Sequence, residues 1–178
     1  AKLWLAWDIK PKAVMGSGVG EYVAATIAGI LQLEDALELV IERSRLLEAS
    51  VNSEEVFSKV VNKINFSQPK IAVIPNNNRK SQEIATAKYW KIHLPATDKI
   101  TVESDTLTNY HICLSLGVKT TNLKFDGIHL SSLIKENEWG QILRSLGELI
   151  VKGMVINWDN FYQNSYCPLQ LPTYPFER

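Results

Sequence analysis

Hydrophobic and polar positions divide the chain into segments of helical and strand-like periodicity. Residues 1 to 9 place Leu3, Trp4 and Trp7 on one side of an expected amphipathic helix. Residues 13 to 15 are a short apolar run that ends in a glycine-rich stretch and a long apolar segment, which is the order strand, tight turn, helix. The same reasoning predicts helices at residues 21 to 33, 34 to 48, 53 to 64 and 81 to 90. A last helix is predicted to begin at Asn137 and to stop at Lys152 and Gly153. Further strands are predicted at residues 70 to 74 and 111 to 116. Helical structure at 97 to 107 stays open because threonine and valine are poor helix formers.

Three strand candidates alternate with helical segments, and this order is typical of an α/β fold. We expect a small, mostly parallel sheet flanked by helices. Residues 1 to 158 are expected to form one domain. Residues 159 to 178 contain many aromatic side chains and three prolines, so we expect an extended tail there.

Composition excludes several classes of protein. With 46% hydrophobic and 21% charged residues, the 178-residue chain has a globular composition. The 19 Lys and Arg residues balance 19 Asp and Glu residues, so we expect no binding of nucleic acid or of a membrane surface. Neither a membrane span nor a signal peptide is predicted. Cys113 and Cys167 are isolated and the three histidines scattered, so we expect reduced thiols, a cytoplasmic location, and no metal or other cofactor.

The glycine-rich turn has the frame of a nucleophile elbow without its nucleophile. Such an elbow needs glycine two residues before and two after the reactive side chain, because a Cβ there is expected to collide within the turn. Gly16 and Gly20 supply that frame, but its centre is Gly18, which has no side chain. An acyltransferase or thioesterase that uses Ser17 stays open as an alternative, although the flanks of Ser17 are not glycines.

A second alternative is a nucleotide-binding module at Gly16–Gly20. Backbone amides of a G-x-G turn before a helix can bind a pyrophosphate. The spacing here is G-x-G-x-G, and no acidic residue ends a second strand about 20 residues later. A tight turn that merely packs closely is therefore the preferred interpretation.

Five segments carry a resemblance to a known family. Residues 13 to 47 (AVMGSGVGEYVAATIAGILQLEDALELVIERSRLL) resemble the acyltransferase domain of modular type I polyketide synthases, in which the turn reads G-H-S-x-G-E and is followed by an L-E-D-A helix start. The resemblance extends to residues 64 to 76, to 83 to 94 (EIATAKYWKIHL), to 139 to 158, and to 171 to 178 (LPTYPFER), which is similar to the linker after the acyltransferase. It implies a shrunken, hydrolase-like acyltransferase core.

The departures from the family affect its chemistry. The resemblance places the family's serine at Gly18 and its histidine at Ser17, so nucleophilic attack is expected to be lost. In the family, a small inserted subdomain and the motif of the catalytic histidine separate two segments that residues 48 to 62 join directly in this chain. The G-Q-G strand, which contributes to the oxyanion hole in the family, is not in this sequence. His93, His111 and His129 are then expected to be packing or surface residues.

Arg43 aligns with the arginine that anchors a malonyl-type carboxylate in the family. Without the enclosing subdomain, a solvated or salt-bridged helix arginine is the preferred interpretation, and the anchor would be vestigial. Loss of the subdomain is also expected to leave Trp4, Trp7 and the helix with Val56, Phe57 and Val60 partly uncovered, which favours dimerisation or a partner.

The resemblance therefore implies a non-catalytic remnant of a polyketide synthase acyltransferase. Its expected role is a structural or docking element between the ketosynthase and downstream domains, with Tyr174, Phe176 and Arg178 as linker contacts. Expected partners are the ketosynthase and neighbouring domains, with a separate acyltransferase, an acyl carrier protein or a second copy of the chain as further candidates.

Overall fold

A computed structural model describes most of the chain. The described residues are 1–48, 53–75, 83–92, 102, 104–117 and 123–162. The chain divides into two compact units, one made of Ala1–Lys10 with Leu146–Arg178 and the other of Pro11–Ser145. Each unit is described by itself.

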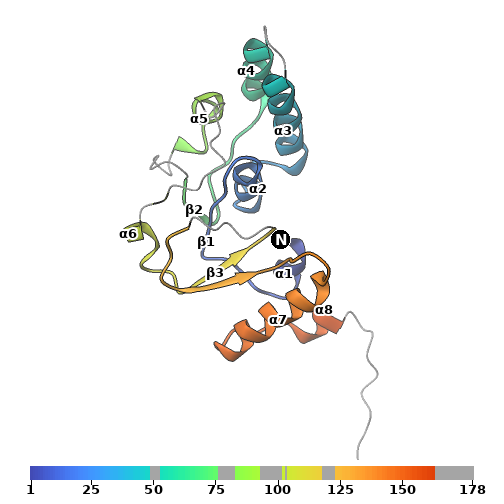
Figure 1. Cartoon of the computed structure of the whole chain (residues 1–178). Helices are drawn as coiled ribbons and strands as arrows, with labels where there is room; N and C mark the ends of the chain where they lie inside the picture. The colour runs from blue at the N-terminus through green and yellow to red at the C-terminus, as the bar shows by residue number, and fades with distance from the viewer. Residues whose placement is uncertain (49–52, 76–82, 93–101, 103, 118–122, 163–178) are drawn as a thin grey trace, which may run out of the picture. The chain divides into compact units, whose positions relative to one another are not determined.

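The Pro11–Ser145 unit holds most of the helices and all of the described strands (Figure 1). Its elements in chain order are β1 (Ala13–Val14), α2 (Val19–Ile27), α3 (Leu33–Glu48), α4 (Ser53–Lys63), β2 (Ala72–Val73), α5 (Ala87–Ile92), α6 (Ser104–Leu107), β3 (Ile112–Ser115), β4 (Ile128–Ser131) and the first part of α7 (Glu138–Val151).

The strands pair in parallel, which confirms the predicted α/β class with short parallel strands and flanking helices. β1 pairs with β2, with Ala13 opposite Ala72, and β3 pairs with β4, with Ile112 opposite Ile128. Within the described residues these are two separate two-stranded sheets rather than the single sheet that we expected. β4 was not predicted, because its four residues are too few for a recognisable alternation.

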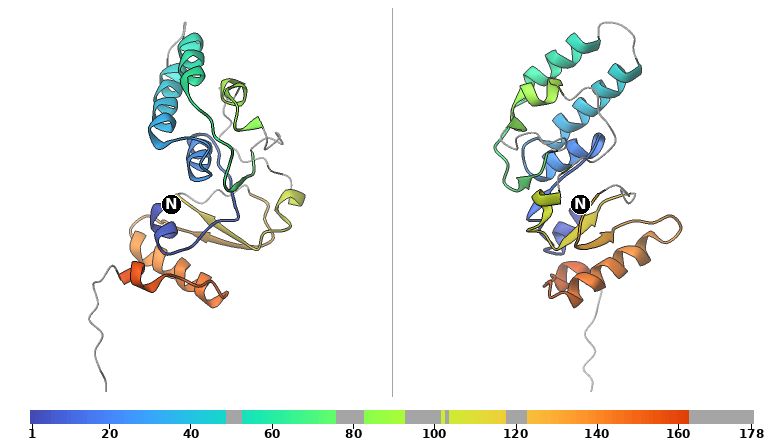
Figure 2. Two further views of the ribbon diagram at one scale, coloured as in Figure 1. Left: turned by 180° about the vertical axis from the view of Figure 1, so that it is seen from behind. Right: turned by 60° about the vertical axis from the view of Figure 1, so that its left-hand side comes forward.

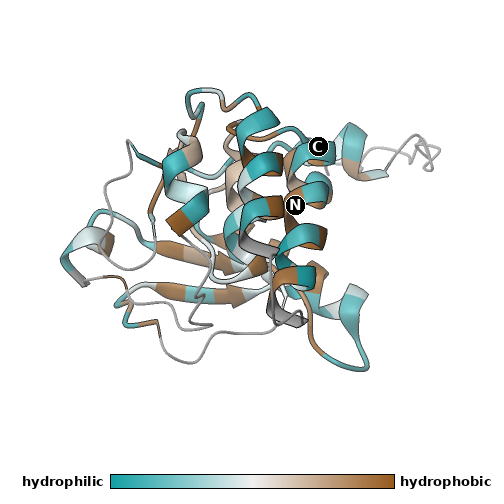
Figure 3. Cartoon of the chain, turned by 90° about the horizontal axis from the view of Figure 1, so that it is seen from above, coloured by the Kyte–Doolittle hydropathy of each residue, from teal (hydrophilic) through white to brown (hydrophobic). Residues whose placement is uncertain are grey.

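Helices α2 to α5 enclose the main core. α3 and α4 lie side by side and antiparallel (Figures 1 and 2), and the view coloured by hydropathy shows apolar strands and helices with mixed faces (Figure 3). Leu39, Val61 and Trp90 are completely buried. The indole Nε1 of Trp90 donates a hydrogen bond to the carbonyl of Ile84 at 2.9 Å, which satisfies its buried polar group. This core fixes the positions of α2 and α5.

The predicted helix from 21 to 33 is interrupted. α2 ends at Ile27, and Gly29 adopts a positive φ of 80°. The amide of Gly29 donates to the carbonyl of Thr26 and the amide of Ile30 donates to the carbonyl of Ala25, which is a Schellman motif. The apolar run continues through this break, so hydrophobicity alone concealed it. Similarly, α5 begins only at Ala87, and only Ser104–Leu107 of the open 97–107 segment is shown as a helix.

The unit formed by the two ends of the chain is built around aromatic rings. It contains α1 (Lys2–Ala6), the end of α7 and α8 (Trp158–Tyr162). The ring centroid of Trp7 lies 5.4 Å from that of Trp4 and 5.1 Å from that of Phe161. The amide of Asn157 donates to the carbonyl of Trp7 at 3.0 Å. These contacts join helices from opposite ends of the sequence.

Two expectations are wrong here. Residues 159 to 162 belong to α8 and are not extended, because Asn157 caps the helix by accepting a hydrogen bond from the amide of Asn160. Residues 163 to 178 lie outside the described part. Trp4 and Trp7 are buried rather than partly uncovered, and their rings pack against each other.

In α4, Phe57 and Val60 are also buried, and only Val56 is exposed. The partly uncovered surface that we expected on this helix is therefore reduced to one side chain, because the other two face the main core.

Candidate functional site

The turn between β1 and α2 is too tight for a side chain at its first glycine. A Cβ placed on Gly16 would lie 2.0 Å from the carbonyl oxygen of Gly20 and 2.5 Å from the amide nitrogen of Glu21. Since these are backbone atoms, the clash cannot be relieved by a rotamer change. A Cβ on Gly20 would meet no atom within 4 Å, so the steric requirement that we expected holds at Gly16 and not at Gly20.

Gly18 lies at the apex and caps α2. Its φ of 57° and ψ of −124° lie outside the regions that other residues readily adopt. A nucleophile elbow is a strained strand-to-helix turn of this kind. Gly18 therefore adopts a strained conformation between β1 and α2, and it carries no reactive atom.

Ser17 precedes the apex and is half-buried. Its carbonyl accepts a hydrogen bond from the amide of Gly20 at 2.9 Å, and the carbonyl of Gly18 accepts one from the amide of Glu21 at 3.3 Å. These two bonds use amides at the start of α2 within the turn itself. Fewer helix N-terminal amides are therefore available to a ligand.

A buried acidic side chain lies directly after the turn. Glu21 is in the first turn of α2 and is only 1% exposed. The hydroxyl of Tyr89 in α5 donates a hydrogen bond to its carboxylate. A buried carboxylate needs such partners, because burial without them is costly. The pair connects α2 to α5 across 68 positions of sequence.

Arg43 of α3 belongs to the same buried environment. It is 6% exposed, and its guanidinium carbon lies 5.9 Å from the centroid of the Tyr22 ring. Its Nε has no hydrogen-bond partner within the described part of the chain. Contrary to our expectation, Arg43 is therefore not solvated, and its guanidinium faces an aromatic ring.

The pKa of Tyr22 reflects this environment. Burial raises it to about 12, Arg43 opposes the rise by favouring the phenolate, and Glu21 adds to it by repulsion. Tyr22 is therefore a neutral packing group at neutral pH. Sequence reasoning did not single out Glu21, Tyr22 or Tyr89, although an acidic residue in an otherwise apolar helix was a usable signal.

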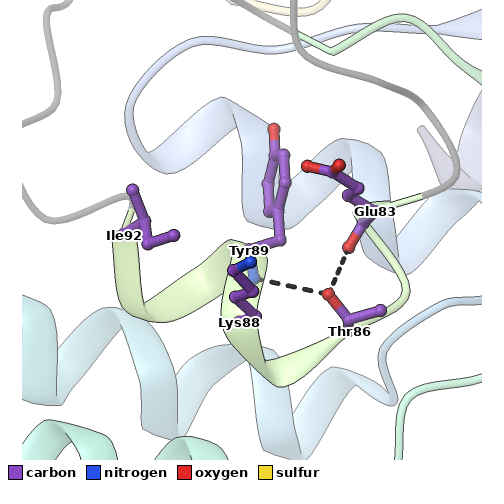
Figure 4. A pocket seen from close by; sticks show the side chains of 5 residues that line it. All are labelled: Glu83, Thr86, Lys88, Tyr89 and Ile92. Carbon is purple, nitrogen blue, oxygen red and sulfur yellow. Dashed lines mark hydrogen bonds between the residues drawn. The ribbon is translucent and has the colours of Figure 1, made fainter.

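The surface near Tyr89 contains a depression of about 410 Å³, lined by residues of α5 and the turn before it (Figure 4). The lining residues are Glu83, Thr86, Lys88, Tyr89 and Ile92. The hydroxyl of Thr86 donates to the carbonyl of Glu83 and accepts from the amide of Tyr89, so it is engaged in capping α5. Among these described lining residues no nucleophile faces a base, so they do not form a candidate active site.

The remaining predicted residues that the structure describes lie in or next to strands β3 and β4. His129 lies in β4, His111 is exposed before β3, and Cys113 is a free, half-buried cysteine of β3 whose pKa is raised by burial. His93, Cys167, Tyr174, Phe176 and Arg178 lie outside the described residues. Among those described, no three His, Cys, Asp or Glu side chains form a group that could hold a metal ion. No described helix is long and apolar enough to cross a membrane.

Sequence comparisons link these elements to known proteins, although no family model matches the chain. The non-reducing polyketide synthase PKS16 of Cladonia grayi is 31% identical over 146 residues, which cover 76% of this chain. The spectinabilin polyketide synthase system protein NorC of Streptomyces orinoci is 27% identical over 187 aligned positions, which cover 97% of this chain. The chain is homologous to polyketide synthases.

A solved structure defines the fold. The acyltransferase domain of ZmaA superposes with a TM-score of 0.75 at 17% identity, and the match covers 97% of this chain and 61% of that chain. The fold is thus that of an acyltransferase domain, as the resemblance implied. The polyketide synthase homologues are far longer than this chain, which spans only 6% of PKS16 and 8% of NorC.

The two outer glycines of the turn give a matched stability test. Gly16→Ala is expected to lower the free energy of unfolding by about 2 kcal/mol or more, because the new methyl group meets backbone atoms. Gly20→Ala, in the open helical position, is expected to change it by less than about 1 kcal/mol. Urea denaturation of both variants measures the difference. Equal destabilisation by the two substitutions would contradict the described turn.

Proposed function

We propose that the chain is a non-catalytic, truncated remnant of a polyketide synthase acyltransferase. It acts as a structural or docking element between the ketosynthase and downstream domains, in the cytoplasm. The observation that carries the proposal is the elbow itself, in which the apex residue, Gly18, retains a positive φ but has no side chain. Attack on a thioester needs a hydroxyl or thiol held at that point.

The general base is also missing from its expected place in the sequence. Residues 48 to 62 contain no histidine, although the family's catalytic-histidine motif belongs in this interval. Of the described histidines, His129 pairs through Nε2 with Ser115, and His111 is an exposed residue before β3. Loss of nucleophile and base together is expected to remove several powers of ten of turnover.

Two other functions are disfavoured by the same turn. An acyltransferase or thioesterase based on Ser17 would use a side chain beside the apex rather than at it. A nucleotide bound at Gly16–Gly20 would place phosphates near Glu21, which already occupies the first turn of α2. In addition, two amides of the turn already donate hydrogen bonds to carbonyls of the same turn.

A docking role needs surface, and α3 provides it. Leu33, Leu37 and Ile41 are exposed at intervals of four residues, so they form one stripe along the helix. Leu37 is 54% exposed and Ile41 is 51% exposed. An apolar stripe of this kind is typical of a helix that has a partner. The proposed partner is the ketosynthase or a separate acyltransferase. An acyl carrier protein, a second copy of the chain and the linker contacts of Tyr174, Phe176 and Arg178 remain further proposals.

Acyl loading at the elbow tests the loss of catalysis. The purified chain is incubated with a malonyl thioester, and peptide mass mapping reports adducts on residues 11 to 27. We expect no adduct at Ser17, because the central position of the turn has no hydroxyl. A stable malonyl ester on Ser17 that Ser17→Ala abolishes would instead show an active transferase or thioesterase.

Substitutions in the stripe test the docking role. Leu37→Glu combined with Ile41→Glu is expected to weaken binding to the ketosynthase of the same synthase, or to a free acyltransferase, at least about tenfold. Both side chains are exposed, so the melting temperature is expected to change little. Lys59→Glu changes the net charge by the same amount from an exposed position on α4 and is the control. Calorimetric titration that gives one affinity for all three proteins would refute the stripe as a docking surface.

A further inference from the structure

Strands β3 and β4 place three chemically active side chains on one face. The strands are parallel, and Cys113 is in register with His129. Successive side chains of a strand point to opposite faces, so Cys113 and Ser115 share a face of β3. His129 lies on the same face, since its ring contacts Ser115. The family resemblance assigned no role to this face.

The Ser115 and His129 side chains are directly paired. Oγ of Ser115 lies 2.6 Å from Nε2 of His129, which is the distance of a short hydrogen bond. When the ring proton is on Nδ1, the serine hydroxyl donates to Nε2, and this is the arrangement of a serine with its general base. Both residues are half-buried rather than enclosed in the core.

Neighbouring hydrogen bonds hold the pair in place. The amide of Ser132 donates to the carbonyl of Ser115 at 2.9 Å and extends the β3–β4 ladder. At the end of β4, the carbonyl of Ser131 accepts from the hydroxyl of Ser145 at 2.7 Å and from the side-chain amide of Gln141 at 3.0 Å. Since Ser145 is buried in α7, the strand that carries His129 is anchored to a helix.

Of the two candidate nucleophiles beside His129, the serine is the better one. Burial raises the pKa of the Cys113 thiol, so this group stays protonated and weakly nucleophilic near neutral pH. Ser115 does not need to ionise in advance, because the imidazole takes its proton during attack.

We propose that Ser115 and His129 form an acyl-acceptor site for activated acyl thioesters. In the reaction, Oγ of Ser115 bonds to the thioester carbonyl carbon, the carbon–sulfur bond breaks, and the hydroxyl proton passes to Nε2 of His129. The imidazolium then protonates the departing thiolate. The product is one ester per chain, and neither oxidant nor reductant is needed.

The acceptor site is independent of the proposed docking function. It uses strands β3 and β4 and no residue of the β1–α2 turn or of the α3 stripe. Loading at Ser115 is stoichiometric modification rather than turnover, so it is compatible with an inactive elbow.

The test uses two probes, a fluorophosphonate and the acetyl thioester of N-acetylcysteamine, followed by intact-mass measurement and peptide mapping. We expect a single adduct at Ser115 from each probe. Ser115→Ala is expected to abolish the adduct, and His129→Gln is expected to slow it at least about tenfold. Two variants serve as controls: Ser17→Ala changes the turn after β1, and Ser44→Ala changes an exposed serine of α3. Both are expected to be labelled to the same extent as the unmodified chain.

Mapping on the unmodified chain decides the question even where a variant fails to fold, and circular dichroism reports the folding of each variant. An unlabelled chain, an adduct at another residue, or equal labelling of a folded His129→Gln variant would each overturn the proposal. An adduct at Ser17 alone would contradict the acceptor site and the inactive elbow together, whereas the absence of any adduct would contradict only the acceptor site.

Discussion

Close contact between two backbone segments controls the β1–α2 turn, since Gly16 lies so near the carbonyl of Gly20 that no Cβ fits between them. This contact sets where α2 begins. The start of α2 then places Glu21 in the core, where it accepts the hydroxyl of Tyr89, and places Tyr22 beneath Arg43. The turn therefore connects β1 to α3 and α5 as well as to its own helix.

The backbone shape of a site and its chemical reactivity depend on different atoms, so a site can keep its shape after its reactivity is lost. The turn requires that residue 16 has no Cβ and that residue 18 adopts a positive φ, and neither requirement involves a hydroxyl. The core around Leu39, Phe57 and Trp90 likewise needs only shape and hydrophobicity. This separation is the physical basis of the proposal that the chain keeps an acyltransferase fold without its reaction. It also explains why the fold comparison by itself does not establish activity.

Periodicity in the sequence predicted the long helices well. α3, α4 and α7 follow the expected boundaries closely, since each carries an apolar stripe, and α7 ends where Gly153 adopts a positive φ as predicted. The lack of a side chain at position 18 is also directly evident from the sequence. These features depend on neighbouring residues only.

Features that depend on distant residues were missed. The break at Gly29 lies within one apolar run, and β4 becomes recognisable only through its pairing with β3. Burial of Arg43 depends on Tyr22 of another helix, and the Glu21–Tyr89 bond joins helices far apart in sequence. The Ser115–His129 pair likewise requires the parallel register of two strands. No local pattern encodes such contacts.

Restoring the missing hydroxyl is the most direct test of the claim that the elbow has lost its base as well as its nucleophile. Gly18→Ser is expected to cost on the order of 1–3 kcal/mol of stability because of the positive φ, and mass mapping after incubation with a malonyl thioester is expected to find position 18 unmodified. Formation of an ester at position 18, followed by its transfer to a phosphopantetheine arm, would contradict the account.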